Sequence, residues 1–250
     1  MNDNSAGLAV HEVLAAVLQV RDGQLQVLLW QRGIEPDLGR WALPGGGLRH
    51  CEDVQTSVLR QLAEKVDVRE VAHVEQLEVF SAPARMPHQR TVATAFLGLV
   101  PCVADPALPL DTAWHPVTDA LGRSPRTAFD HGLIVHRARD RLRAKLSYTN
   151  LGFALAPPEF TVSALRELYS AALGHRVSAT NLQRVLARRG VLTPTGGTAA
   201  PGPSGGRPAA LYRFAEHDMR VTDPFAVLRP PEPRSAPNPT IHCANPHPAS

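Results

Sequence analysis

The sequence contains few cysteines and no hydrophobic run long enough to cross a membrane. Its three cysteines are widely spaced and form no C-x-x-C pair, so we expect neither a disulfide framework nor a zinc knuckle. No apolar stretch approaches the roughly 18–20 residues that span a bilayer, and the N-terminus lacks the basic segment and apolar core of a signal peptide. We therefore expect a cytoplasmic globular protein without a membrane partner, and its 250 residues suffice for two modest domains.

Lysine is also scarce, and basic charge is unevenly distributed. Lysine occurs only at positions 65 and 145, so arginine supplies nearly all of the 26 basic side chains. Residues 8–120 carry 9 basic and 14 acidic side chains, whereas residues 121–157 and 158–214 each carry 7 basic and 2 acidic ones. An arginine surplus in one part of a chain is typical of nucleic-acid binding, because guanidinium groups pair with phosphates and with guanine. A GC-rich genome explains the arginine content equally well.

Hydrophobic patterning in the first half of the chain predicts strands and one helix. Residues 10–30 form two apolar runs around an Asp-Gly turn and predict a β-hairpin. Apolar residues at helical spacing predict a helix over 52–66. Two further segments, 71–81 and 90–100, are rich in β-branched and apolar residues and predict strands. The first half therefore combines strands with a helix.

A long amphipathic helix is predicted at 129–146, after a region at 101–128 that we expect to be irregular. The apolar stripe of this helix consists of Leu133, Ile134, Ala138, Leu142 and Leu146. Its other side carries arginines, and we expect that side to be solvated. His131, near the start of the helix, is expected to cap or pack rather than to bind a metal.

Two shorter helices follow a pair of prolines. Thr161 and Ser178 are the expected N-caps of helices that end near residues 173 and 189. A short turn that contains glycine joins the two helices, which is the helix-turn-helix pattern. The second helix places polar and basic side chains on one face, where they are able to contact base edges.

The remaining chain predicts the hairpin of a winged helix and then a tail. Residues 195–206 form a Gly/Pro-rich loop, and residues 207–214 predict the strand that returns from it. The last 22 positions include 7 prolines and almost no large aliphatic side chains. We therefore expect residues 228–250 to form a disordered, Pro-rich tail.

The most specific motif lies just before and within the first predicted helix. Residues 46–68 resemble the Nudix box, Gly-x5-Glu-x7-Arg-Glu-U-x-Glu-Glu-x-Gly-U, in which U is a bulky aliphatic residue. The matching positions are Gly46, Glu52, Arg60, Leu62, Glu64 and Val68, and the departures are Gln61, Lys65 and Asp67. Positions 61, 64 and 65 share one side of a helix, where the family holds Mg²⁺ through carboxylates.

The departures remove two of the three carboxylates from this side of the helix. An amide stands at Gln61 and an ammonium group at Lys65. Diphosphate hydrolysis in this family depends on a metal ion that polarises the substrate and activates water. We therefore expect no bound metal, no required cofactor and little or no catalysis. Lys65 would repel Mg²⁺ and is able to pair with Glu64 or with a ligand phosphate instead.

A degenerate Nudix box followed by a winged helix resembles the NrtR family of regulators of NAD metabolism. The resemblance extends over about residues 8–214, and its most discriminating parts are Asp130-His131-Gly132 and Gly206 to Tyr212. It implies an α/β (α+β) fold, with a Nudix-like mixed-sheet α/β/α sandwich at 8–146 that senses a ligand. A winged helix-turn-helix domain at 147–216 would bind DNA.

The resemblance also implies partners for this chain. They are a palindromic operator in double-stranded DNA at NAD biosynthesis genes, a second copy of the chain in a homodimer, and ADP-ribose or a related NAD metabolite as effector. Repression is the expected direction of control, although activation remains an alternative. Two other functions remain open: an ADP-ribose or nucleoside diphosphate hydrolase with an accessory nucleic-acid-binding domain, and an RNA-binding adaptor.

The resemblance further assigns residues to the two binding sites. The implied ligand-binding residues are Arg32, Trp41, Gly45, Gly46, Arg85 and Arg90. The implied DNA-binding residues are Thr180, Asn181, Arg184, Arg188 and Arg207. Structural roles compete with these assignments, because Trp41 equally suits a core position. The helix arginines, Arg189 included, equally suit a solvated face.

Overall fold

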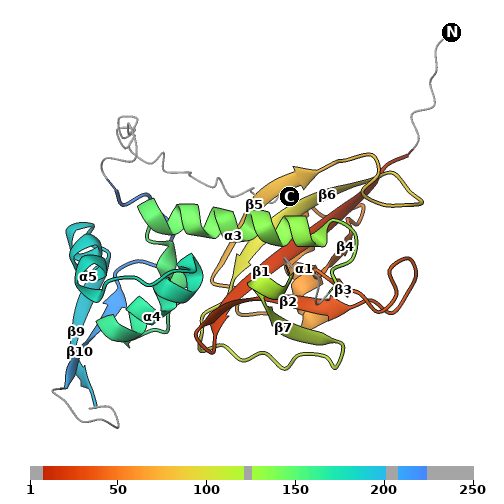
Figure 1. Ribbon diagram of the computed structural model, residues 1–250. Coiled ribbons are helices and arrows are strands. Elements are labelled where there is room, and N and C mark those ends of the chain that lie inside the picture. Colours follow the sequence, from red (N-terminus) through yellow and green to blue (C-terminus); the bar gives the residue numbers. More distant parts are fainter. Residues whose placement is uncertain (1–7, 121–125, 201–207, 224–250) are drawn as a thin grey trace, which may run out of the picture.

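A mixed sheet and a smaller helical unit make up the described part of the chain. The computed structural model describes residues 8–120, 126–200 and 208–223. The large sheet contains β1 (Val10–Arg21), β2 (Gln24–Gln31), β3 (Trp41–Ala42), β4 (Gly45–Gly47), β5 (His73–Phe80), β6 (Thr91–Leu99) and β7 (Thr112–Pro116). Its order is β3-β2-β1-β6-β5, with β4 paired to β1 and β7 paired to β2. Helices α1 (Val54–Val66) and α3 (His131–Tyr148) lie on opposite faces of this sheet (Figure 1).

The central strand β1 explains why two helices cover the sheet. Its residues from Val13 to Leu18 are fully buried, although successive side chains of a strand point to opposite faces. Leu14 packs in the same core cluster as Ile134 of α3, whereas Val13 packs in a second cluster with Leu62 of α1. A continuous apolar run is what a strand between two helical layers requires. The predicted α/β/α sandwich is confirmed.

The turn between β1 and β2 confirms the predicted hairpin. Arg21 pairs with Gln24 across the turn. Asp22 and Gly23 both have positive φ angles, 50° and 72°. A two-residue hairpin loop with two left-handed residues has the type I′ geometry, which Asp-Gly sequences favour.

Helix α1 begins two residues later than predicted. Asp53 is its N-cap, and the Asp53 carboxylate accepts a hydrogen bond of 2.7 Å from the Thr56 amide. Glu52 therefore precedes the helix instead of lying in its first turn. The helix ends at Asp67, which has a left-handed φ of 51° and donates its amide hydrogen to the Leu62 carbonyl oxygen.

The region 101–128 is more regular than predicted. It contains β7, which pairs antiparallel with β2, and the one-turn helix α2 (Val117–Ala120). Both elements are short and lie among prolines, so neither shows a periodicity that a sequence window can detect. Pairing with β2 supplies the hydrogen bonds that define the strand. Residues 121–125 lie outside the described part.

Helix α3 has the predicted length but begins and ends two residues later than predicted, and both its apolar and its arginine-rich side differ from expectation. Ile134, Ala138, Leu142 and Leu146 are buried, whereas the side chain of Leu133 is 48% exposed. The four buried residues follow an i, i+4 spacing, and Leu133 lies about 100° away from that stripe. The arginine-rich side is not simply solvated, because Arg141 and Lys145 form ion pairs with Glu75 of β5 at 3.2 and 2.6 Å.

The C-terminal unit has the predicted order of a winged helix. It contains η1 (Leu151–Ala154), β8 (Phe160–Thr161), α4 (Val162–Leu173), α5 (Ala179–Arg188), β9 (Leu192–Ala199) and β10 (Ala209–Phe214). Thr161 and Ser178 cap α4 and α5, as predicted, by accepting hydrogen bonds from the Ala164 and Asn181 amides. The strand β9 extends to Ala199 instead of ending near 194, because Ala199 pairs with Ala209 of β10.

The two units are connected by helix α3 and by direct packing. Helix α4 packs against α3 and against β1 and β2 of the large sheet. The predicted division between residues 146 and 147 falls inside the last turn of α3, so this helix belongs to the junction itself. The predicted tail at 228–250 and Arg207 lie outside the described residues. No helix among the described residues is long and apolar enough to span a bilayer.

Candidate functional site

The Arg60 side chain neutralises the first glutamate of the Nudix-box pattern. Arg60 of α1 donates two hydrogen bonds to the Glu52 carboxylate, of which the Nε bond measures 2.8 Å. Glu52 also accepts a hydrogen bond of 2.8 Å from the Arg49 amide. The hydrogen bonds from Arg60 are the main reason that the pKa of Glu52 falls to about 2. This carboxylate holds the loop before α1 in place.

The second glutamate of the box faces the same group of arginines. One Glu64 carboxylate oxygen accepts hydrogen bonds from Arg60 at 3.2 Å and from Arg49 at 3.3 Å. These pairs extend along the exposed side of α1, where Glu64 is about half exposed. Both glutamates that the motif retains are therefore engaged by guanidinium groups.

The two positions of the box at which a glutamate is replaced face the glycine loop β4. Gln61 is 4% exposed, and a Cβ atom added to Gly46 would lie 2.7 Å from the Gln61 side-chain nitrogen. The Lys65 ammonium group donates a hydrogen bond to the Gly45 carbonyl oxygen. It also lies 5.4 Å from the centre of the Trp30 ring. Desolvation of the ammonium group lowers the pKa of this lysine, although the residue as a whole is exposed.

The side chains at positions 61, 64 and 65, where the Nudix pattern has glutamates, do not fit a divalent metal ion. Mg²⁺ requires several oxygen ligands, with carboxylates among them. Here one candidate ligand is an amide, one is a carboxylate in two ion pairs, and one is a cation. Within the described ranges, no group of three or more His, Cys, Asp or Glu side chains is placed to hold a metal.

The predicted ligand residues Arg32 and Trp41 lie near the start of α3. The Arg32 guanidinium group lies 4.8 Å from the centre of the Phe129 ring, and its Nε donates a hydrogen bond to the Pro36 carbonyl oxygen. Trp41 is partly buried against the core and contacts the His115 ring edge to face. Backbone hydrogen bonds also join Trp41 to the segment that leads into α3. Both the core and the ligand interpretation of Trp41 are compatible with this position.

Arg85 has two protein partners at this end of the molecule. It donates two hydrogen bonds to Asp130, at 3.0 and 2.9 Å, and one to Glu12 of β1 at 3.2 Å. Its side chain is 1% exposed. Arg90, which is exposed, donates to the carbonyl oxygens of Ser81 and Ala82. Neither Glu12 nor Asp130 was predicted as a site residue, and the sequence signal for Asp130 was its place in the Asp-His-Gly run.

His131, the first residue of α3, packs as expected. Its Nδ1 atom accepts a hydrogen bond of 2.9 Å from the Leu43 amide, so Nδ1 carries no proton. Burial lowers the pKa of His131 to about 4, and the ring is neutral at physiological pH. The site therefore contains a neutral imidazole beside the Arg85–Asp130 ion pair.

The proposed DNA-reading helix α5 has a clear division of faces. Leu182 and Leu186 are buried, whereas the four predicted DNA-binding residues of this helix are exposed. They are Thr180, Asn181, Arg184 and Arg188. Arg184 donates a hydrogen bond of 2.9 Å to the Asn181 side-chain oxygen, which places these two on one face.

The side chain of Arg189 is buried between elements of the fold and does not lie on the solvated face of α5. It is 7% exposed and forms an ion pair of 3.1 Å with Asp223. It also donates a hydrogen bond to the Ser147 carbonyl oxygen in the last turn of α3. These adjacent arginines therefore differ in role, because Arg188 is exposed to solvent, whereas Arg189 links the end of α5 to α3 by a hydrogen bond.

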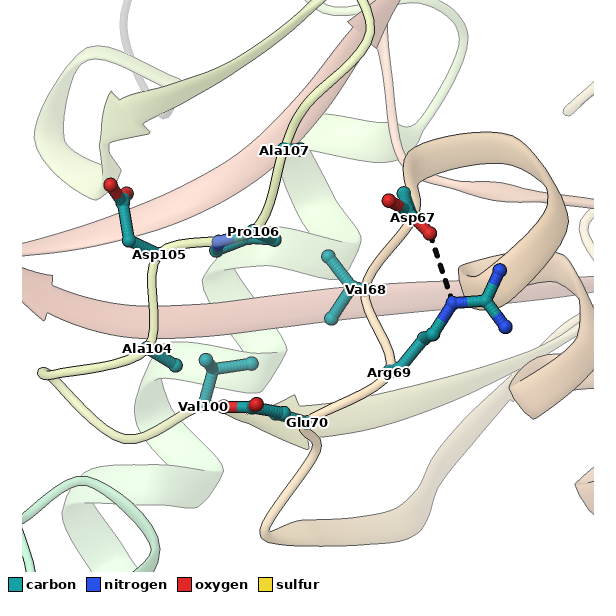
Figure 2. A pocket seen from close by; sticks show the side chains of 9 residues that line it. All are labelled: Asp67, Val68, Arg69, Glu70, Val100, Ala104, Asp105, Pro106 and Ala107. Atoms are coloured by element: carbon teal, nitrogen blue, oxygen red, sulfur yellow. Dashed lines mark hydrogen bonds and ion pairs between the residues drawn. The ribbon is translucent and has the colours of Figure 1, made fainter.

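A separate cavity of about 180 Å³ lies beyond the C-terminal end of α1. The Asp67–Arg69 ion pair lies on one side of it and the segment 104–107 on the other (Figure 2). It contains none of the residues predicted to bind ligand or DNA. The glycine loop and the start of α3 remain the candidate effector site.

Comparisons with known proteins match both halves of the chain. The NUDIX domain model matches residues 10–137, and the model of the NrtR DNA-binding winged helix domain matches residues 152–214. An ADPR-responsive transcriptional repressor from Acinetobacter baylyi is 32% identical over 220 residues, which are 86% of each chain.

Solved structures agree with these matches. Shewanella oneidensis NrtR is 33% identical, with a TM-score of 0.71 over 82% of this chain and 94% of that one. The same protein in complex with a 27mer DNA is 32% identical, with a TM-score of 0.69 over 81% and 92% of the two chains. A MutT/nudix family protein from Enterococcus faecalis, at 24% identity and a TM-score of 0.67 over 84% and 90%, shares the fold.

Proposed function

Because this chain belongs to the NrtR family of Nudix-related transcriptional regulators, we propose that it is a DNA-binding repressor controlled by an NAD metabolite. ADP-ribose is the proposed effector, since the Acinetobacter relative responds to ADPR. NAD biosynthesis genes are the proposed targets. A regulator that binds the chromosome acts in the bacterial cytoplasm, which is the location that we propose.

The observation that supports this function best is the position of α3 between the two candidate sites. At its N-cap, Asp130 is held by Arg85. At its last turn, the Tyr148 carbonyl oxygen accepts hydrogen bonds from the Thr222 and Asp223 amides, and Arg189 of the winged helix contacts Ser147. A ligand that moves the start of α3 would therefore move the DNA-reading unit.

We further propose that the Nudix domain lacks hydrolase activity. Glu52 and Glu64 are engaged by arginines, and Gln61 and Lys65 replace the other expected carboxylates. A hydrolase function is favoured only by the match to the NUDIX domain. Purified protein with MgCl₂ and ADP-ribose should release no AMP, and metal-dependent turnover would support the hydrolase alternative.

The winged helix would read DNA through the exposed face of α5. Asn181, Arg184 and Arg188 of this face offer amide and guanidinium donors, which pair with adenine, guanine and phosphate. We propose that a homodimer places two such helices on a palindromic operator, because two-fold symmetric operators mirror two-fold symmetric proteins. An effector releases the operator if it binds the off-DNA arrangement more tightly.

Fluorescence anisotropy tests this function directly. Labelled duplexes from upstream regions of NAD biosynthesis genes are compared with scrambled duplexes, with and without ADP-ribose or NAD. We expect tight binding to a native duplex and its weakening by ADP-ribose. Equal, steeply salt-dependent binding to both duplexes would contradict the proposal and indicate only an electrostatic surface. Preference for single-stranded RNA would support the adaptor alternative.

A further inference from the structure

Both glutamates that the Nudix box of this chain retains are paired with arginine. Glu52 receives two hydrogen bonds from Arg60 and one from the Arg49 amide. Glu64 receives one from each of the same two arginine side chains. A Mg²⁺ ion at these two carboxylates would compete with the guanidinium groups that pair with them. The negative charge that the motif retains is thus already neutralised.

Lys65 stands at the position where the Nudix pattern has its last glutamate, beside the glycine loop. It is in the last turn of α1, one turn after Gln61, and its ammonium group reaches back to the Gly45 carbonyl oxygen of the glycine loop. The face of the Trp30 ring, 5.4 Å away, attracts a cation through its quadrupole. Trp30 is itself fixed, because its indole nitrogen donates a hydrogen bond of 3.1 Å to the Leu43 carbonyl oxygen.

The ammonium group retains donors for a ligand. An ammonium group has three N–H donors, and the described residues provide one hydrogen-bond acceptor for Lys65, at Gly45. Arg32 and Arg60 are close enough to disfavour its charge, whereas Glu12 favours it. Arg60 is itself paired with Glu52 and Glu64, and Glu12 with Arg85, whereas no ion pair among the described residues involves Arg32 or Lys65. Arg32 and Lys65 are thus two neighbouring cations without an anionic protein partner. Such a field repels Mg²⁺ and attracts an anion.

We infer that Lys65 takes the place of the divalent cation, so that the diphosphate of the effector is bound by an ammonium group without a metal ion. This inference rests on the proposed function, since it concerns the same nucleotide site. It makes Lys65 a ligand-binding residue that directly contacts phosphate oxygens. It also separates binding from hydrolysis, because an ammonium group compensates phosphate charge but generates no metal-bound hydroxide.

Isothermal titration calorimetry of the full chain with ADP-ribose tests the inference. Titrations are run in EDTA and in millimolar MgCl₂ with the wild type, Lys65→Met, Lys65→Glu and the control Arg69→Met. We expect equal affinity of the wild type in both buffers and an unchanged affinity of Arg69→Met. Lys65→Met should weaken binding roughly tenfold or more in both buffers, because a charge-assisted hydrogen bond is lost. Lys65→Glu should bind poorly in EDTA and regain affinity with MgCl₂.

A second measurement tests, in the absence of nucleotide, whether Lys65 prevents a metal ion from binding. Electron paramagnetic resonance of Mn²⁺ should show no bound ion in the wild type and a bound ion in Lys65→Glu, with thermal melts confirming that both are folded. Wild-type binding of ADP-ribose that requires MgCl₂, unchanged affinity of Lys65→Met, or Mn²⁺ bound by the wild type would each overturn the inference. If no wild-type titration shows ADP-ribose binding, the proposed effector is wrong, and the Mn²⁺ result still decides whether Lys65 excludes the metal.

Discussion

At the residue scale, Asp67 stands at a position that suits glycine better. It ends α1 with a φ of 51°, and the Nudix pattern has glycine at this position. A left-handed conformation costs a residue with a Cβ atom free energy that glycine does not lose. The chain accepts this cost because aspartate tolerates left-handed angles better than most side chains.

Replacing Asp67 by glycine should therefore stabilise the protein. We expect Asp67→Gly to raise the free energy of unfolding by about 0.5–1 kcal/mol, measured by urea unfolding at neutral pH. Asp67→Ala is the matched control, since it removes the same carboxylate but keeps a Cβ atom. If the alanine variant is as stable as the glycine variant, relief of the backbone conformation is not the cause.

His131 gives the protein a pH-dependent stability at the same scale. Burial lowers its pKa to about 4 in the folded protein, whereas an unfolded histidine titrates near 6.5. Its contribution is complete above about pH 6.5 and is lost as the pH falls toward 4, because only the unfolded chain takes up the proton. We expect the free energy of unfolding to decrease across this range.

Substitution of this histidine isolates its part of the pH dependence. Glutamine does not titrate, and its side-chain oxygen is able to accept the hydrogen bond from Leu43. Urea unfolding at several pH values should show a shallower decrease for His131→Gln than for the wild type. His88→Gln, at an exposed position, should keep the wild-type slope. If the free energy of unfolding depends on pH equally in all three proteins, His131 does not cause the decrease.

At the element scale, Gly174 allows α4 to end against α3. It has a φ of 75°, and a Cβ atom added to it would collide with the Arg143 guanidinium group. Gly190, which follows α5, also has a positive φ, 63°, but nothing lies within 4 Å of an added Cβ atom. Both glycines have a left-handed backbone, and only Gly174 is also closely approached by a side chain, that of Arg143 from α3.

This difference predicts unequal costs for the same substitution. Gly190→Ala should lower the free energy of unfolding by about 1 kcal/mol, as expected for a left-handed backbone. Gly174→Ala should cost more, because Arg143 must also move. Chemical denaturation of both variants, and of Gly174→Ala combined with Arg143→Ala, measures the excess. The excess should disappear in the double variant, and its persistence there would exclude the contact with Arg143.

At the end of α5, two neighbouring arginines have different roles. Arg188 is exposed on the proposed DNA-binding face, whereas Arg189 is paired with Asp223. Arg188→Ala should leave thermal stability nearly unchanged, weaken operator binding and reduce the salt dependence of that binding by about one phosphate contact. Arg189→Ala should lower stability by about 1–3 kcal/mol because its partners lose a buried, charged hydrogen-bond donor. Thermal melts and anisotropy titrations at several salt concentrations distinguish the two, and the opposite pattern would contradict this division.

At the scale of the whole molecule, the two sites should be energetically coupled through α3. If ADP-ribose weakens operator binding by a given factor, the operator must weaken ADP-ribose binding by the same factor. Calorimetric titration of ADP-ribose into free and operator-bound protein measures one factor, and anisotropy measures the other. Unequal factors would indicate that a further equilibrium, such as a change in oligomeric state, accompanies binding.

Local patterns in the sequence were sufficient to predict the order and type of most elements. The hairpin at the start, the helix of the Nudix box, and the caps Thr161 and Ser178 each depend on residues within a few positions of one another. The degenerate Nudix box could also be recognised from the sequence. The spacing of its matching residues and its departures at Gln61 and Lys65 depend only on the order of residues in the chain. Periods of two and of 3.6 residues, together with capping chemistry, carry this information.

Only the tertiary structure decided which charged groups meet. Arg85 finds Asp130 45 residues away, Arg189 finds Asp223 34 residues away, and Arg141 finds Glu75 66 residues away. No periodicity within one element specifies such partners, so arginines predicted to contact ligand or solvent were found in protein ion pairs. The strand β7 was missed for a related reason, because its hydrogen bonds come from β2. The sequence determined the elements and the loss of metal ligands through local spacing, whereas long-range packing decided which remaining charges are free to bind.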